Sequence, residues 1–205
     1  MKKGFTLIEL LIVIAILAIL ATTVVLVLNP AQILAETRDG QRLNDLSTLQ
    51  SAISLYLANS SNPIMSYRGS CSTQCFTHNA GVSNAGCAGL GAARHSATIN
   101  GGATKDATAS STTSRSTDGL GWLPVKFSDI SGGAPFSLEP VDPTNSSTYF
   151  YSYACAQSGK TFELDAEMES SRYQSGGSGD VESNTKDGGD VNTAYEVGND
   201  PVLDQ

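Results

Sequence analysis

The sequence predicts an α+β protein in which a long N-terminal helix packs on a small antiparallel β-sheet. Three observations predict this class. Residues 5–28 form an apolar run with a single charge, residues 43–57 carry apolar side chains three and four positions apart, and residues 147–169 alternate as two strands around a turn. A chain of 205 residues suits one domain plus such a helix.

The apolar run is long enough to cross a membrane. A bilayer core about 30 Å thick needs about 20 helical residues, and residues 5–28 carry only Glu9 as a charge. Lys2 and Lys3 precede the run and Arg38 is the next basic residue, so the positive-inside bias predicts a cytoplasmic N-terminus and an exported remainder. A secretory signal fits poorly, because its apolar core spans only about 7–15 residues. An acid inside a bilayer costs on the order of 3 kcal/mol, so Glu9 requires a partner.

The residues around this acid resemble a known export signal. The stretch KGFTLIE at residues 3–9, followed by an aliphatic run, is similar to the class III signal of bacterial type IV prepilins and of the related pseudopilins of type II secretion. The resemblance implies that a membrane peptidase cuts between Gly4 and Phe5 and that Phe5 is then N-methylated. It also implies that Glu9 pairs with the amine of Phe5 on a neighbouring subunit. Such a buried pair is expected to set the axial register of the filament more than to increase its stability.

After the apolar run, the helix is expected to break at Asn29 and Pro30, because proline lacks the amide hydrogen that a helix interior needs. An amphipathic half then covers residues 30–60 and ends in the turn residues 59–63. Its apolar stripe is predicted to pack against the head of the protein, with Arg42, Asp45, Thr48 and Ser51 among the polar residues between. The stripe consists of Leu43, Leu46, Leu49, Ile53 and Leu57.

The chain divides into five predicted parts. These are a leader (1–4), a transmembrane or filament-core helix (5–29), the amphipathic half (30–60), a globular head (61–175) and an acidic, glycine-rich C-terminal segment (176–205). Large apolar residues are scarce from Met65 to about Gly121, so this part of the head is expected to form loops. Residues 104–118 are expected to be a solvated outer loop, with glycan attachment to their Ser and Thr hydroxyls as an alternative.

Cysteines are expected to hold the loop region together. The chain has four: Cys71, Cys75, Cys87 and Cys155. An exported domain meets an oxidising environment, so two disulfides are predicted, with three connectivities open. The favoured arrangement is a local bridge to Cys87 from one of the first two cysteines and a bridge from the other to Cys155. A zinc site that adds His78 and His95 to the first three cysteines is a less favoured alternative, because the spacings are irregular.

The clearest β signal is a hairpin over residues 147–156 and 161–169, with residues 157–160 as its turn. One face of the second strand is apolar and should pack on the helix stripe. The other face should meet water, and it carries Glu163, Asp165, Glu167 and Glu169. Residues 121–125 and 135–141 are expected to add a short strand or two. No nucleophile motif or phosphate loop accompanies these carboxylates, so no enzyme is predicted.

The charge balance argues against nucleic acid as a direct partner. Cleavage after Gly4 removes Lys2 and Lys3, which leaves 10 basic and 20 acidic residues and a formal charge of −10. Residues 176–205 place acids among glycines, a composition that suits either a flexible tail or a Ca²⁺ site. Major type II pseudopilins as a group use a C-terminal calcium site, and that resemblance points to Asp187 and Asp190. No other cofactor is expected.

The resemblance predicts a structural subunit of a type IV pilus-like filament, with roles such as adhesion or motility. Its implied partners are like subunits, the prepilin peptidase and N-methyltransferase, and the inner-membrane assembly machinery. The implied location is the cytoplasmic membrane and then an extracellular or periplasmic filament. A type II secretion pseudopilin and a membrane-tethered adhesin or binding module remain as alternatives.

Overall fold

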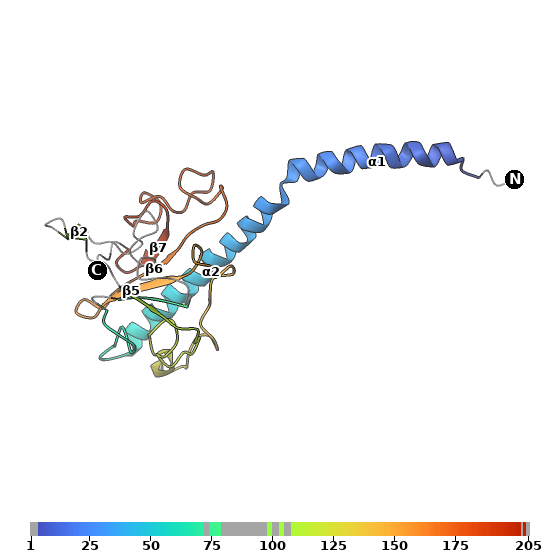
Figure 1. Ribbon diagram of the computed structural model, residues 1–205. Coiled ribbons are helices and arrows are strands. Elements are labelled where there is room, and N and C mark those ends of the chain that lie inside the picture. The colour runs from blue at the N-terminus through green and yellow to red at the C-terminus, as the bar shows by residue number, and fades with distance from the viewer. Residues whose placement is uncertain are drawn as a thin grey trace.

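The computed structural model describes six stretches of the chain: residues 4–71, 74–78, 98–99, 103–104, 108–201 and 203. It has the predicted α+β class, with a long N-terminal helix in two parts and a mostly antiparallel five-stranded sheet. Helix α1 (Leu7–Leu28) projects away from the head, and helix α2 (Pro30–Asn59) lies along the sheet (Figure 1). The start of α1 therefore lies at the far end of the molecule from the head.

The predicted helix break at Asn29 is confirmed. Asn29 takes the left-handed conformation with φ of 40°, which a short polar side chain tolerates better than most. Pro30 follows as the first residue of α2, where its missing amide hydrogen removes no helical hydrogen bond. The predicted helix end is also confirmed, because α2 stops at Asn59 and the Ser60 amide donates to the Tyr56 carbonyl at 3.0 Å.

The main sheet has the strand order β4-β1-β5-β6-β7, and only β1 and β4 run parallel. Its strands are β1 (Gln74–Thr77), β4 (Thr108–Ser111), β5 (Ser152–Ala156), β6 (Thr161–Ala166) and β7 (Tyr195–Gly198). The predicted hairpin is confirmed as β5 and β6 with its turn at residues 157–160. A short second sheet pairs β2 (Thr98–Ile99) with β3 (Ala103–Thr104), and η1 (Phe127–Asp129) is a single 3₁₀ turn.

Three sequence expectations about where the head forms strands are wrong. Strands β1 and β4 lie in the region expected to form loops, and β7 lies in the segment for which a flexible tail was one expectation. Each of these strands is only four residues long, so pairing with its neighbours decides its structure. Residues 121–125 and 135–141 form irregular segments without strands. They still contribute to the core, since Trp122 is fully buried and its Nε1 donates to the Pro140 carbonyl at 2.8 Å.

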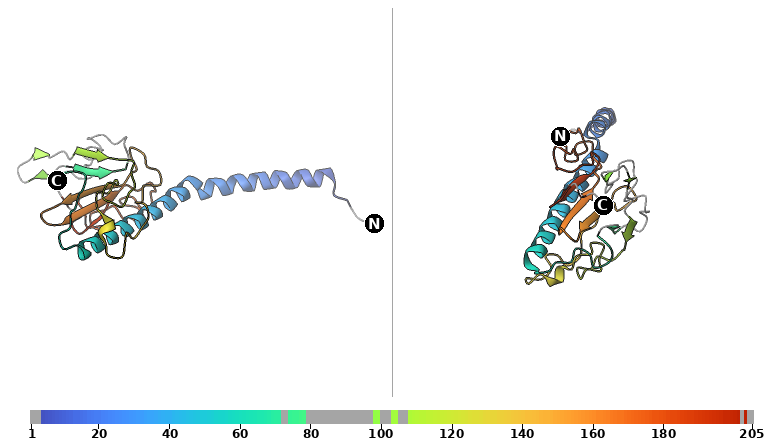
Figure 2. Two further views of the ribbon diagram at one scale, coloured as in Figure 1. Left: turned by 90° about the horizontal axis from the view of Figure 1, so that it is seen from below. Right: turned by 90° about the vertical axis from the view of Figure 1, so that its left-hand side faces the viewer.

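Helix α2 lies against one face of the sheet, as the two further views in Figure 2 show. The core lies between them. Leu46, Leu49 and Ile53 of the predicted stripe are fully buried, whereas Leu43 and Leu57 are half-buried. The facing sheet residues alternate along their strands, so every second side chain reaches the helix. The main ones are Tyr153, Cys155, Phe162, Leu164 and Ala166.

Arg42 is fully buried between α2, the loop at Asp142 and the chain that follows β6, instead of facing water as a polar residue of α2. Its guanidinium donates to Asp39 at 2.8 Å and to both oxygens of Asp142 at 2.6 and 2.9 Å, and it also pairs with Glu169. The Tyr149 ring lies against it, with the guanidinium carbon 5.2 Å from the ring centroid. A buried charge of this kind persists because every donor has a partner.

The buried ion cluster joins three segments that are distant in sequence. Asp39 also accepts hydrogen bonds from the amides of Glu169 and Ser170, at 2.9 and 2.8 Å. Although burial opposes ionisation, hydrogen bonds from Arg38, Thr144 and Arg42 lower the pKa of Glu169 to about 2. Glu169 therefore serves as an internal anion that fastens the chain after β6 to α2, contrary to the expectation that it meets water.

Replacing Arg42 with Met should lower the free energy of unfolding by about 3–5 kcal/mol, because three carboxylates would lose their shared counter-charge. Arg172→Met is the matched control, since that side chain is 52% exposed and pairs with Glu36 at 3.2 Å. The control should lose less than about 1 kcal/mol. Urea unfolding of the full chain in detergent micelles, followed by the fluorescence of Trp122, measures both. Equal losses for the two variants would contradict a central role for Arg42.

Glu139 is a second buried acid of the head. Its Oε2 accepts from the Leu123 amide at 3.1 Å, whereas Oε1 accepts no hydrogen bond from the described residues. A Cβ on Gly121 would lie 2.3 Å from that Oε2, so only glycine fits beside the carboxylate. Burial raises the pKa of Glu139 to about 8, although the amides of Leu123 and Trp122 and the charge of Arg68 oppose the shift.

Glu139 should make the head less stable as the pH rises. In the unfolded chain its carboxyl loses its proton near pH 4.5, but in the folded chain only near pH 8, so ionisation favours unfolding over that interval. Wild type should lose on the order of 3 kcal/mol more than Glu139→Gln between pH 4.5 and pH 9. Urea unfolding at a series of pH values measures the difference, and parallel curves for the two proteins would refute it.

Candidate functional site

The surface of α1 is apolar on all sides. The large apolar side chains from Phe5 to Val25 are all exposed, and Phe5 itself is 84% exposed. Among the described residues, this N-terminal helix is the one long and apolar enough to cross a membrane. A helix that is hydrophobic all round requires lipid or other helices around it. The helix therefore fits membrane anchoring.

Glu9 caps the helix that contains it. Its Oε2 accepts hydrogen bonds from the Thr6 amide at 2.9 Å and from the Thr6 hydroxyl at 2.7 Å. The Glu9 amide in turn donates to the Thr6 hydroxyl at 3.3 Å, which completes a capping box. The family resemblance implies a partner for Glu9 only on filament assembly, whereas here Thr6 of the same chain already holds its carboxylate. The spacing Thr6-x-x-Glu9 before an apolar run is the sequence signature of a capping box, and it indicates Thr6 as the partner of Glu9 before assembly.

Gly4 and Phe5 lie just before this cap, in non-helical chain outside α1. Both are exposed, and a Cβ on Gly4 would meet no atom within 4 Å. The bond between them is therefore not protected by the fold of the head. This geometry suits cleavage by another protein, since the peptide can enter a foreign active site without local unfolding.

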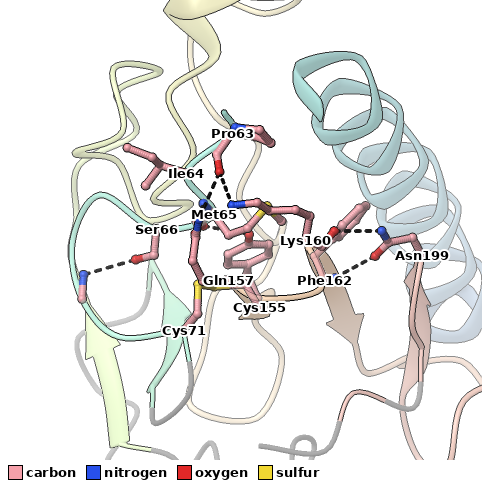
Figure 3. Close-up of a disulfide and its surroundings, with 12 residues drawn as sticks. Pro63, Ile64, Met65, Ser66, Cys71, Cys155, Gln157, Lys160, Phe162 and Asn199 are labelled. Carbon is pink, nitrogen blue, oxygen red and sulfur yellow. Dashed lines mark hydrogen bonds between the residues drawn. A yellow bond between two sulfur atoms is a disulfide. The ribbon is translucent and has the colours of Figure 1, made fainter. Parts of the chain in front are cut away.

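One disulfide closes the long loop of the head, and it joins Cys71 to Cys155 over a sequence separation of 84 residues. Cys155 lies on β5, so the bridge ties the chain after α2 to the centre of the sheet (Figure 3). Cys75 is disulfide-bonded as well, and Cys87 lies outside the described residues. A bridge over a loop of this length stabilises a folded domain by about 4 kcal/mol.

Hydrogen bonds beside the disulfide hold the same two segments together. The Pro63 carbonyl accepts from Gln157 Nε2 at 3.1 Å and from Lys160 Nζ at 2.7 Å, and the Met65 amide donates to Gln157 Oε1 at 2.8 Å (Figure 3). The hairpin turn between β5 and β6 is thus attached to the chain that leaves α2. Neither segment can move away from the core without breaking these contacts.

The zinc alternative is wrong for the residues that the structure describes. Cys71 and Cys75 are disulfide-bonded, so neither supplies the thiolate that zinc requires. The ring of His78 donates from Nε2 to the Thr113 carbonyl at 3.0 Å and accepts at Nδ1 from the side-chain Nδ2 of Asn145 at 3.0 Å. Burial lowers the pKa of His78, which favours this neutral ring. His95 lies outside the described residues.

The acidic face of β6 is buried, contrary to the expectation that it meets water. Glu163 and Asp165 are at most 2% exposed, and strand pairing sets Asp165 opposite Glu196 of β7, which is also buried. Carboxylate oxygens of the three lie within 4.8 Å of one another. Burial and the neighbouring carboxylates raise the pKa of Glu196 to about 8 and raise the pKa of Glu163 as well. The cluster could not be recognised from the sequence, because Glu196 lies on β7, which was not predicted.

The two aspartates that the sequence suggested for calcium occupy different surroundings. Asp187 accepts from the Gly189 amide at 3.0 Å and from the Glu196 amide at 3.2 Å, so both of its oxygens fix the turn that leads into β7. Asp190 is exposed on the surface. The one group of three or more metal-ligating side chains found among the described residues is the β6–β7 cluster, which contains neither aspartate.

An exposed apolar helix joined to a disulfide-linked α+β head fits a protein that is anchored in a membrane by its N-terminus. Residues 1–25 match the model of the prokaryotic N-terminal methylation motif. With the long apolar helix, this match fits a type IV pilin-like prepilin, and it supports a precursor of the pilin or pseudopilin type. Such a motif implies processing by a prepilin peptidase and assembly into a filament. Comparisons with curated proteins and with solved structures gave no match.

Proposed function

We propose that the chain is a structural subunit of a type IV pilus-like filament. It enters the membrane as a prepilin, is cleaved between Gly4 and Phe5, is methylated at Phe5 and is assembled through α1. The observation that carries this proposal is the exposed apolar surface of α1 directly after the methylation motif. That surface needs lipid before assembly and neighbouring α1 helices afterwards, because its side chains are apolar on every side.

Glu9 has a role at both stages of this proposal. Before cleavage, its carboxylate is held by the amide and hydroxyl of Thr6 at the start of α1. Cleavage creates a positively charged amine at Phe5, and the carboxylate of a neighbouring subunit then meets that amine in the filament core. The pair favours one axial register, since other registers leave both charges unpaired in an apolar environment.

Mass spectrometry of the N-terminal peptide tests the processing steps. Filaments are sheared from cells that make the protein, and the peptide is recorded in the sheared and membrane fractions. We expect methylated Phe5 in abundant sheared material. Methylated Phe5 confined to the membrane fraction would indicate a pseudopilin or a minor subunit instead. An intact N-terminus from Met1 would contradict the prepilin assignment.

Two variants separate the charge of Glu9 from its capping role. Glu9→Gln retains a capping side chain but removes the charge, because glutamine also completes a capping box. Thr6→Ala keeps the charge and removes the cap, at a cost of about 0.5–2 kcal/mol in helix stability. We expect Glu9→Gln to abolish the protein in sheared filaments and Thr6→Ala to reduce it only in part. Normal assembly of Glu9→Gln would refute the charge pair.

A further inference from the structure

We propose that Glu163, Asp165 and Glu196 form a binding site for a Ca²⁺-like divalent cation inside the head. The site uses β6 and β7 and none of the residues that carry filament assembly. The inference goes beyond the proposed function and does not rest on it. A cation here would hold the C-terminal segment of the chain on the sheet.

The three side chains converge because of strand register. Asp165 pairs with Glu196 across β6 and β7, and Glu163 lies two residues before Asp165 on the same face of β6. Gly198 is the strand partner of Glu163, so no side chain from β7 occupies the space opposite that carboxylate. The three carboxylates offer oxygens within 4.8 Å of one another and are nearly inaccessible to solvent.

Each carboxylate is oriented by a donor from a different part of the head. Ser152 Oγ donates to Asp165 at 3.1 Å, the Leu203 amide donates to Glu163 at 2.9 Å, and the Val191 amide donates to Glu196 at 2.8 Å. Supporting hydrogen bonds of this kind fix the direction of metal ligands in proteins. The cluster is therefore a set of positioned oxygens and not a group of mobile surface acids.

Glu196 provides a second observation that points to a ligand. Its side chain is fully buried, and its Oε1 accepts no hydrogen bond from the described residues. A buried carboxylate oxygen without a donor is costly, because it has lost the hydrogen bonds that water provides. A cation that binds this oxygen and the two neighbouring carboxylates would remove that cost and offset their mutual repulsion.

The chemistry of the oxygens selects the class of cation. Carboxylate oxygens are hard ligands, which suit Ca²⁺ or Mg²⁺ better than zinc or copper. Oxygens around Ca²⁺ lie about 2.3–2.6 Å from the ion, so ligands on opposite sides are about 5 Å apart, whereas Mg²⁺ holds them at about 4 Å. The carboxylate oxygens of the cluster lie within 4.8 Å of one another, a separation that is compatible with Ca²⁺. Water would complete the six to eight ligands that calcium prefers.

Thermal unfolding with and without calcium tests this site. The full chain in detergent micelles is freed of metal with a chelator and then titrated with CaCl₂, with Trp122 fluorescence as the signal and calorimetry for the stoichiometry. We expect one bound Ca²⁺ per chain and a rise in Tm of about 5–10 °C at 100 times the Kd. No calcium-dependent shift in wild type would overturn the proposal. The proposal would also be overturned if the Tm rose only on acidification and not on addition of calcium, because a shared proton would then replace the ion.

Matched variants locate the ion. Glu196→Gln should lose the calcium-dependent shift, while its Tm in chelator should equal or exceed that of wild type, because a buried acid is replaced by a neutral side chain of the same size. Asp165→Asn should behave in the same way. Asp190→Asn is the control, since it removes an exposed acid from the same segment, and it should retain the full shift. Loss of the shift in Asp190→Asn with retention in Glu196→Gln would place calcium elsewhere and overturn the proposal.

Discussion

The buried guanidinium of Arg42 is the interaction on which the head depends. A single cation meets carboxylates from α2, from the loop after Val141 and from the chain after β6, so the helix, a loop and the sheet share one counter-charge. Hydrophobic contacts between α2 and the sheet are not directional and would tolerate small shifts along the helix. The ion cluster permits one arrangement only, because any shift leaves buried charges unpaired.

The sheet separates two different environments. Toward α2, side chains such as Tyr153 and Leu164 form the apolar core, and the disulfide from Cys155 extends it to the chain after α2. On the opposite face, Asp165 and Glu196 are buried with an acidic neighbour beneath the C-terminal segment. The first face provides the free energy of folding. The second face concentrates acidic groups that need protons or a cation. The stability of the head should therefore depend on the pH and on the cation concentration.

Several features could be predicted because the chain near each residue determines them. The apolar run specifies a helix that is long and apolar enough to span a membrane, Asn29 and Pro30 specify its break, and the alternation of residues 147–169 specifies the β5–β6 hairpin. Strands β1, β4 and β7 could not be predicted, since a segment of only four residues becomes a strand only beside a partner. The buried state of Arg42 was missed for the same reason, because its partners lie about a hundred residues away.

The sequence alone determined the features of the N-terminal region: the methylation motif, the position of Glu9 and the apolar surface of α1 depend only on neighbouring residues. Tertiary structure decided which charges lie inside the head. Glu163 and Asp165 alternate as they would on a solvated strand, and only the pairing of β6 with β7 and the chain above it removes them from water. Burial depends on contacts between distant segments, and local periodicity carries no information about them.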